Sequence, residues 1–494
     1  MARVVVVGAG MGGLSAAARL AALGHAVTVL EQAPEVGGKL GRYARDGFVF
    51  DTGPSLLTLP AVYRDLFLTT GDALETVLDL VPVDPTAHYR FPDGTEVDVP
   101  NASRSGVARA FDEALGAGAG AQWTSFLQRA GRIWDLTREP FLESPLDGWR
   151  TLAGLARSWD AVRTVAPWRS LRGLGEQHLR DPRLRMFLDR YATYTGSDPR
   201  RAPAALATVP YVEQVFGSWY VRGGLRLLGD AVRDRAVERG ARVEAGVEVV
   251  EVLVEGGRAA GVRLADGRTV PADVVVSGVD AAQLYGGLVR APSAARSLRR
   301  ATPSLSGVVL LLALRGRTPG LAHHTVLFPD DYDAEFDAVF GRRGPQRPVD
   351  DPTVYVSAPD DPALRPDDDH EAWFVLVNAP RHAPGAGVDW DAEGLADAYA
   401  DRVLAAMARR GLDVRGRLLW REVRTPADLE RATRSPGGSI YGTSSNGARG
   451  AFLRPANRSP VPGLFLVGGS SHPGGGLPLV GLSAAIVADL VGPA

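Results

Sequence analysis

Residues 3–13 of the chain read RVVVVGAGMGG, and residues 14–24 continue as LSAAARLAALG. The four valines predict a short buried strand, because they are β-branched and too few for a helix. The glycines after them fall in the spacing G-x-G-x-x-G, at Gly8, Gly10 and Gly13, with Gly12 beside them. In this spacing the glycines permit a tight turn, leave room for a pyrophosphate and let the next helix pack closely. The alanine-rich segment predicts that helix, whose N-terminal N–H groups and dipole face the phosphates.

A carboxylate follows the second apolar run. Residues 26–30 predict another buried strand, and Glu31 ends it at about the ~20-residue distance typical of dinucleotide sites. A carboxylate at this place accepts hydrogen bonds from both ribose hydroxyls, and it disfavours the 2′-phosphate of NADP. A lone glycine-rich turn is often only structural. The strand before it, the helix after it and the acid together favour a dinucleotide site.

The composition excludes several classes of function. With 494 residues, 45% hydrophobic and 23% charged, the chain is expected to form two or three domains around a large core. A net charge of −2 gives no reason to expect nucleic acid as a partner. The chain has no cysteine, so disulfides, thiol nucleophiles and iron–sulfur clusters are excluded. Its eight histidines lack metal-ligand spacing, so no metal site is expected.

Membrane contact is expected to be peripheral. The N-terminus lacks the pattern of a signal peptide, and apolar runs such as 308–314 are far shorter than the ~20 residues of a spanning helix. We therefore expect a cytoplasmic protein. One segment combines tryptophan with arginine, at Trp149, Trp159, Trp168, Arg150, Arg157, Arg163, Arg169 and Arg172. This combination suits a membrane interface, although an ordinary amphipathic surface helix with tryptophans facing the core fits equally well.

The rest of the chain alternates between strand and helix patterns. A hairpin is expected at 86–99, around Pro92-Asp93-Gly94. Helices are expected at 107–115, 123–133, 152–165, 183–191, 390–410 and 482–491. Strands are expected at 242–255, 259–264, 269–277, 307–314, 325–328, 354–357 and 373–378. The stretch 341–370 is rich in Pro and Asp and predicts a solvated loop on both sides of the expected strand 354–357.

Two titratable residues are candidates for proton transfer. Glu213 lies in the aromatic segment 211–224, where burial would raise the proton affinity of its carboxylate. His472 lies in the glycine-rich turn 468–476, which follows an apolar strand and precedes the last helix. The alternative for both is structural, as a satisfied buried carboxylate and a turn histidine, and we favour that alternative.

Motifs along nearly the whole chain resemble a known family. They are residues 8–13, 37–54, 191–199, 211–224 and 439–481. Together they resemble the bacterial carotenoid desaturases of the phytoene desaturase type, which share an extended FAD fingerprint with amine oxidases. Within that family, SIYGTSSNG at 439–447 and RPANRS at 454–459 are most similar to the acyclic hydroxy- or methoxy-carotenoid 3,4-desaturases.

The resemblance implies a fold and its domains. We expect an α/β protein: a Rossmann-like FAD-binding domain, an inserted mixed sheet-and-helix substrate domain, and a helical membrane-facing region. The FAD domain would combine residues 1–100, 221–295 and 435–494. The helical region would be 101–220, and the substrate domain 296–434.

The resemblance also implies a set of cofactor contacts. Lys39 stands where the family usually has arginine, so its contact with the pyrophosphate would be that of a point charge. Val249 would contact the adenine through its backbone, and the C-terminal turn and helix would contact the ribityl-phosphate and flavin ring. The full set is Gly8, Gly10, Gly12, Gly13, Glu31, Gly38, Lys39, Ser55, Leu56, Val249, Gly468, Gly469, Pro478, Leu479 and Val480.

The implied activity is desaturation of a lipophilic carotenoid drawn from a membrane. A hydride leaves for FAD and a proton leaves from the adjacent carbon, while the protein orients the substrate and excludes water. The final acceptor would be oxygen or a membrane quinone. Phytoene desaturases, carotenoid oxidases or ketolases, and carotenoid isomerases share most of these motifs and are alternatives. More distant alternatives are an amine oxidase and a non-catalytic prenyl-lipid carrier on the same fold.

Overall fold

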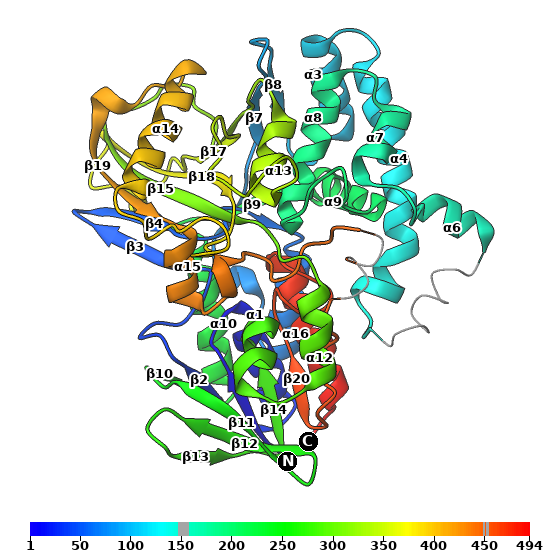
Figure 1. Cartoon of the computed structure of the whole chain (residues 1–494), viewed down its shortest axis with the longest axis vertical. Coiled ribbons are helices and arrows are strands. Elements are labelled where there is room, and N and C mark those ends of the chain that lie inside the picture. The colour runs from blue at the N-terminus through cyan, green and yellow to red at the C-terminus, as the bar shows by residue number, and fades with distance from the viewer. Residues whose placement is uncertain (147–157, 448–449, 451–453) are drawn as a thin grey trace.

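The computed structural model describes residues 1–146, 158–447, 450 and 454–494. Figure 1 shows a lower body that carries both termini, a large sheet above it, and a group of helices beside that sheet. The lower body is built from segments that lie far apart in the sequence, as its mixture of blue, green and red ribbon shows.

A five-stranded parallel sheet forms the centre of the lower body, in the order β10-β2-β1-β14-β20. The strands are β1 (Arg3–Val7), β2 (Ala26–Glu31), β10 (Arg242–Ala245), β14 (Val274–Ser277) and β20 (Leu464–Leu466). The helices are α1 (Met11–Ala22), α2 (Ala61–Thr70), α10 (Arg226–Glu238) and α16 (Leu477–Val491). An antiparallel sheet adds β11 (Val249–Glu255), β12 (Arg258–Leu264) and β13 (Thr269–Pro271).

The valines of β1 belong to two different cores. Val4 and Val6 pack with side chains of the helices α1, α10 and α16. Val5 and Val7 pack with residues of β11 and β12. Both faces of the parallel sheet are therefore covered, which explains why its strand is an unbroken apolar run rather than an alternating one.

A seven-stranded sheet forms the second body, in the order β19-β15-β18-β17-β16-β7-β8. The strands are β7 (Ala87–Arg90), β8 (Glu96–Val99), β15 (Ser306–Arg315), β16 (His324–Leu327), β17 (Val354–Ser357), β18 (His370–Ala379) and β19 (Leu418–Arg424). The helices are α13 (Tyr332–Phe340), α14 (Leu395–Arg409) and α15 (Pro426–Thr433). The strands expected at 307–314, 325–328, 354–357 and 373–378 are confirmed.

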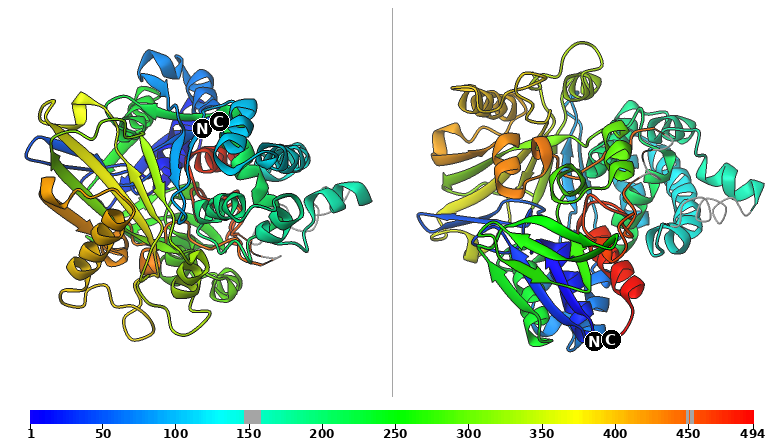
Figure 2. Two further views of the ribbon diagram at one scale, coloured as in Figure 1. Left: turned by 90° about the horizontal axis from the view of Figure 1, so that it is seen from above. Right: turned by 60° about the horizontal axis from the view of Figure 1, so that its bottom comes forward.

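The third part is helical and lies beside this sheet (Figures 1 and 2). It contains α3 (Arg104–Leu115), α4 (Ala119–Thr137), α6 (Trp159–Val165), α7 (Leu171–His178), α8 (Pro182–Arg190) and α9 (Thr208–Phe216). Its core is aromatic: the ring of Trp123 contacts the rings of Phe126 and Phe187. Among the described helices, none has the length and apolar character needed to cross a bilayer.

Short elements join these parts. They are the strands β3 (Arg42–Arg45), β4 (Phe48–Asp51), β5 (Leu57–Thr58), β6 (Leu80–Pro82) and β9 (Ser218–Val221), and the helices α11 (Ala281–Gln283) and α12 (Pro292–Arg300). Single turns of 3₁₀- or π-helix add 74–76, 138–142, 191–195, 204–207, 284–288, 362–364, 415–417 and 436–438. Strand β9 pairs with both β5 and β6, so the chain leaving the helical part is tied to the N-terminal third before it enters α10.

The expected hairpin is confirmed, but its place differs from the expectation. Strands β7 and β8 pair antiparallel, with Tyr89 opposite Val97. Strand β7 also pairs in parallel with β16, and the ring of Tyr89 contacts Phe187 of the helical part. Residues 87–99 therefore belong to the seven-stranded sheet, and our expectation that 1–100 lies wholly in the FAD domain was wrong for this hairpin.

Two expected strands are each divided in the structure. Residues 242–255 separate at Gly246, whose φ of +73° turns the chain. The first piece joins the parallel sheet beside β2, and the second joins β12 in the antiparallel sheet. Residues 269–277 divide in the same way into β13 and β14. The apolar pattern marked these segments as strands but could not show that each changes sheets.

Two expected helices have different starts. Helix α14 begins at Leu395 rather than at residue 390, because Gly394 precedes it in the left-handed conformation. Helix α16 begins at Leu477 rather than at residue 482, with Pro478 in its first turn. Proline is well suited to the first turn, where its missing N–H has no partner in the helix.

Candidate functional site

The first glycine-rich turn connects β1 tightly to α1. Gly8 has a φ of +93°, and its N–H donates to the carbonyl of Leu30 at 2.8 Å. A Cβ atom on Gly13 would overlap the carbonyl oxygen of Gly8. Helix α1 can therefore start directly above the sheet only if residue 13 is glycine.

Gly10 differs from its neighbours because the space next to it is open. It precedes α1 with a φ of −72° and a ψ of 173°. A Cβ atom placed there would meet no heavy atom of the described residues within 4 Å. The first N–H groups of a helix are donors without a partner inside the helix. Open space at the start of a helix therefore fits a bound pyrophosphate.

Glu31 lies at the end of β2, next to this turn. Its carboxylate accepts the N–H of Ala9 at 2.6 Å and the N–H of Ala33 at 2.9 Å. Its backbone carbonyl accepts the N–H of Val247 at 2.8 Å, two residues before Val249. The structure thus brings together the residues that we expect to bind the ribose and the adenine.

The second glycine pair packs against the first turn. The N–H of Gly37 donates to the carbonyl of Ala9 at 2.8 Å. A Cβ atom on Gly38 would lie 3.2 Å from Cα of Gly10. The expectation that both glycine motifs border one site agrees with this contact.

The partners of Lys39 in the structure are two backbone carbonyls near the C-terminus. Its Nζ donates to the carbonyls of Ser439 at 2.8 Å and Ile440 at 2.7 Å. Burial lowers the pKa of Lys39 to about 8. The ammonium therefore fastens the segment 439–447 to the N-terminal turn, and its contact with a pyrophosphate stays a prediction.

The C-terminal glycine turn closes over the start of α1. A Cβ atom on Gly12 would lie 2.8 Å from Cα of Gly468. Gly469 lies beside Val480 in the first turn of α16, which also contains Pro478 and Leu479. A buried guanidinium, Arg454, donates to the carbonyls of Tyr441, Thr443 and Gly469. Both ends of the chain thus form one site.

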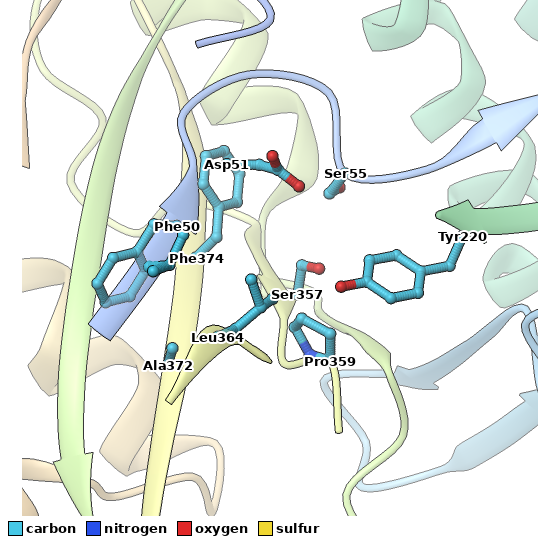
Figure 3. A pocket seen from close by; sticks show the side chains of 10 residues that line it. Phe50, Asp51, Ser55, Tyr220, Ser357, Pro359, Leu364, Ala372 and Phe374 are labelled. Atoms are coloured by element: carbon cyan, nitrogen blue, oxygen red, sulfur yellow. The ribbon is translucent and has the colours of Figure 1, made fainter. Parts of the chain in front are cut away.

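Ser55 and Leu56 lie between β4 and β5, where the lower body meets the seven-stranded sheet. The Oγ of Ser55 lies 2.6 Å from the Oη of Tyr355 on β17. A cavity of about 20 Å³ opens beside Ser55, and Figure 3 shows Tyr220 pointing into it towards Ser357. This volume holds about one water molecule, so this cavity is too small to be the carotenoid site.

Asp51 was missed by the sequence reasoning. Its carboxylate accepts the N–H groups of Leu225 at 2.6 Å and Arg226 at 2.9 Å, at the start of α10. Burial raises the pKa of Asp51 to about 6, while these two hydrogen bonds act to lower it. Its position at the end of an apolar run and just before Gly53-Pro54 was the available signal. Asp51 joins the second glycine motif to α10.

Glu213 is a buried carboxylate with partners on both oxygens. The hydroxyl of Tyr191 donates to Oε1 at 2.6 Å, and the hydroxyl of Tyr194 lies 3.5 Å from Oε2. Burial raises the pKa of Glu213, and the tyrosines together with the charge of Arg190 act in the opposite direction. This arrangement fits the structural interpretation, and a role in proton transfer stays an untested prediction.

His472 joins the C-terminal turn to the helical part. Its Nε2 lies 3.0 Å from the carbonyl oxygen of Ser144, so this nitrogen acts as a donor. The ring makes an edge contact with Phe141, and burial lowers the pKa of the imidazole. An imidazole that is neutral and donates a hydrogen bond to a carbonyl fits a structural role for His472 better than the role of a base.

The tryptophan- and arginine-rich segment is described only in part. Trp149, Arg150 and Arg157 lie outside the described residues. Trp159 and Trp168 are 69% and 59% exposed. Arg172 is partly buried and forms ion pairs with Asp189 and Asp333 at 2.7 Å each, so the charge of this arginine already has partners within the protein.

One group in the described part of the chain has metal-ligand spacing. Ligand atoms of His382, Asp389 and Asp391 lie within 4.8 Å of one another. The Nδ1 of His382 accepts the N–H of Trp390 at 3.1 Å, and Arg431 pairs with Asp391 at 2.8 Å. These groups already have protein partners, so the cluster carries no argument for a resident metal.

Comparisons with known proteins agree with this geometry. A family model described as flavin containing amine oxidoreductase matches residues 11–387. The chain is 36% identical to a 4,4′-diapolycopene oxygenase of Methylomonas sp, over 99% of this chain and 98% of that protein. It is 35% identical to a hydroxyneurosporene desaturase of Cereibacter sphaeroides, over 99% and 98%. It is 34% identical to a zeta-carotene-forming phytoene desaturase of Myxococcus xanthus, over 99% and 93%.

Solved structures show the same fold at low sequence identity. A triple mutant of putrescine oxidase matches with a TM-score of 0.66 and 16% identity, over 99% of this chain and 98% of that one. An oxidoreductase of Methanosarcina mazei matches with a TM-score of 0.63 and 17% identity, over 99% and 100%. These likenesses establish the α/β fold with its mixed sheets.

Proposed function

Because the chain belongs to the flavin containing amine oxidoreductase family, we propose that it is an FAD-dependent carotenoid desaturase. The proposed substrate is an acyclic carotenoid with a hydroxyl on carbon 1, oxidised at the 3,4 bond. The main support for the proposal is sequence similarity over nearly the whole chain to relatives whose names are those of carotenoid-modifying enzymes. The substrate assignment also uses the resemblance of residues 439–447 and 454–459 to the 3,4-desaturases.

FAD is the cofactor of this family, and the residues present fit it. The open space at Gly10, at the N-terminus of α1, suits the pyrophosphate. The carboxylate of Glu31 at the end of β2 suits the ribose. The turn at Gly468 and the first turn of α16 offer backbone N–H groups to the ribityl chain and the ring. Bound FAD supplies a hydride acceptor.

The protein's own contribution to desaturation is binding, orientation and exclusion of water. A hydride and a proton leave adjacent carbons, and the polyene delocalises the positive charge that develops between these two losses. Glu213 and His472, the two residues considered for proton transfer, already have hydrogen-bond partners. Proton transfer to either residue stays a prediction, and the proposed final electron acceptor is oxygen or a membrane quinone.

The test is incubation of the FAD-loaded protein with liposomes that contain a 1-hydroxylated acyclic carotenoid, phytoene, or neither. Chromatography with mass analysis would identify the products. We expect the hydroxylated substrate to lose hydrogen and to lengthen its conjugated chain. Conversion of phytoene alone would move the assignment to phytoene desaturation. Parallel samples with oxygen or a quinone would identify the acceptor.

Carotenoid oxygenation is the second candidate, because one of the relatives is named as an oxygenase and shares 36% identity over the full length. The same experiment separates the two candidates. A product that has gained an oxygen atom would support oxygenation. A product that has only lost hydrogen would support desaturation.

Peripheral membrane contact is part of the proposal. Helix α6 projects sideways from the helical part (Figures 1 and 2), and Trp159 on α6 and Trp168 just after it are exposed. Large exposed aromatic side chains are suited to the headgroup region of a bilayer. Replacing both with serine should abolish co-flotation with liposomes and leave the unfolding temperature unchanged. Leu68→Ser, at an equally exposed position on α2, is the matched control and should float normally.

A further inference from the structure

A buried guanidinium at the end of α8 has few partners. Arg190 is only 8% exposed. Within the described part of the chain, the one hydrogen bond of its guanidinium runs from Nη1 to the Oη of Tyr194 at 2.7 Å. A guanidinium carries five N–H donors, and a buried charge without sufficient partners is costly. Arg190 therefore has donors to spare for another group.

The surroundings of Arg190 are aromatic. Its guanidinium lies over the rings of Tyr194 at 5.1 Å and Tyr355 at 5.2 Å from the ring centroids. Among the described residues no carboxylate lies within ion-pair distance of it, and the nearby Glu213 is reached through the hydroxyl of Tyr194. Tyr194 and Tyr355 are each partly exposed, so solvent-accessible space borders the two rings that flank the cation.

This space lies next to the residues that we expect to bind FAD. On one side, Tyr355 shares a hydrogen bond of 2.6 Å with Ser55. On the other side, the ring of Tyr441 packs against Gly196, two residues after Tyr194, and fills the place where a Cβ atom of Gly475 would lie. Gly475 immediately precedes the first turn of α16. Arg190 is thus held between two cofactor-facing segments by the helical part.

We propose that Arg190 binds the oxygen atom of the substrate's oxygenated end group and so selects hydroxylated carotenoids over hydrocarbon ones. This inference rests on the proposed function. A hydroxyl on carbon 1 lies only two carbons from the 3,4 bond, so its binding group must lie close to the flavin. Arg190 meets this requirement through Tyr355, which it contacts and which bonds Ser55, one of the residues expected to bind FAD. The rings of Tyr194 and Tyr355 pack against the methyl groups on the same carbon.

Selectivity follows from the cost of leaving a buried donor without an acceptor. A site that hydrogen-bonds a substrate hydroxyl discriminates strongly against the analogue that lacks it, because the protein group is then unpaired. A hydrogen bond from a charged donor is at the strong end of the range for such bonds. Arg190 is therefore a specificity-determining residue rather than an acid or base.

The test compares wild-type and Arg190→Met holoenzymes on two substrates in liposomes, a 1-hydroxylated acyclic carotenoid and the same polyene without the hydroxyl. We expect Arg190→Met to raise KM for the hydroxylated substrate by roughly tenfold or more. The KM for the hydrocarbon should stay the same or fall, so the preference disappears. The matched control is Arg185→Met on the same helix, where the guanidinium bonds the backbone carbonyl of Arg180 and no other described residue; the preference should persist there.

Other outcomes would overturn the inference. If Arg190→Met lowers activity equally on both substrates, Arg190 does not bind the substrate hydroxyl. A shift of the flavin reduction potential in the absence of substrate would also count against the inference. If this variant does not fold, the Kd values of the wild-type holoenzyme for the two carotenoids are compared instead, and equal Kd values would count against the inference. A wild type that oxidises both substrates equally would refute this inference alone. A wild type that oxidises neither would refute the proposed function itself.

Discussion

Replacing Gly10 with alanine should separate cofactor binding from folding. The φ of −72° and ψ of 173° at Gly10 are allowed for alanine, and the added methyl group meets no protein atom within 4 Å. Loss of chain entropy in the unfolded state favours alanine by about 0.4–1 kcal/mol, and the poorer helix cap costs about the same. The free energy of unfolding of the FAD-free protein should therefore change by less than about 1 kcal/mol.

FAD binding should suffer much more from the same change. The methyl group would fill the space in front of α1, where the helix N–H groups are expected to donate to the pyrophosphate. Losing about two hydrogen bonds to a charged group costs about 3–6 kcal/mol, which is a rise of roughly 100- to 10,000-fold in Kd.

Two measurements check this prediction. Calorimetric or fluorescence titration of the FAD-free protein gives the Kd, and denaturant unfolding gives the stability. Gly13→Ala is the contrasting variant, because its Cβ atom would overlap the carbonyl oxygen of Gly8, and it should fail to fold stably. If Gly10→Ala binds FAD as tightly as the wild type, the pyrophosphate does not pass over Gly10 and the proposed position of the cofactor is wrong.

Three further changes test single groups. The pKa of Asp51 is raised to about 6 from 3.8, so its ionisation should lower stability by about 2 kcal/mol as the pH rises from 4 to 6. Asp51→Asn should remove this slope in pH-dependent unfolding, and an unchanged slope would contradict the burial of Asp51. Glu213→Gln should leave the rate of flavin reduction within about threefold, whereas a loss of about 100-fold or more at unchanged stability would identify Glu213 as the base. Lys39→Met should lower stability by about 1–3 kcal/mol, since two carbonyls lose their donor; a large rise in the Kd of FAD at unchanged stability would instead place Lys39 on the pyrophosphate.

The parts of the fold that depend on neighbouring residues could be predicted from the sequence. The turn at Gly8 to Gly13 is one example, because a short apolar strand, the glycine spacing and the following helix are all local features. The buried strand that ends at Ser277 and the strands of the large sheet followed from apolar runs in the same way. Where the chain passes from one sheet to another, as at Gly246, the apolar pattern predicted a strand but did not show which strand it pairs with.

Contacts between distant segments could not be predicted in this way. Lys39 bonds carbonyls about 400 residues further along the chain, and Ser55 meets Tyr355 at a separation of 300 residues. Asp51 caps a helix that begins 175 residues later. A single sequence carries no signal for such pairs, so Lys39 was assigned to the cofactor and Arg190 received no role. The candidate site was found where its residues form local motifs and missed where tertiary packing brings them together.

The central claim is that the chain passes hydride from a carotenoid to its flavin. The most direct measurement is the visible spectrum of the FAD-loaded protein under anaerobic conditions, with liposomes containing a 1-hydroxylated acyclic carotenoid, and with chromatography of the extracted pigment. We predict bleaching of the flavin together with a product that has a longer conjugated chain, in equal molar amounts. Formation of the product without bleaching, or an intact substrate beside fully oxidised flavin, would contradict the claim.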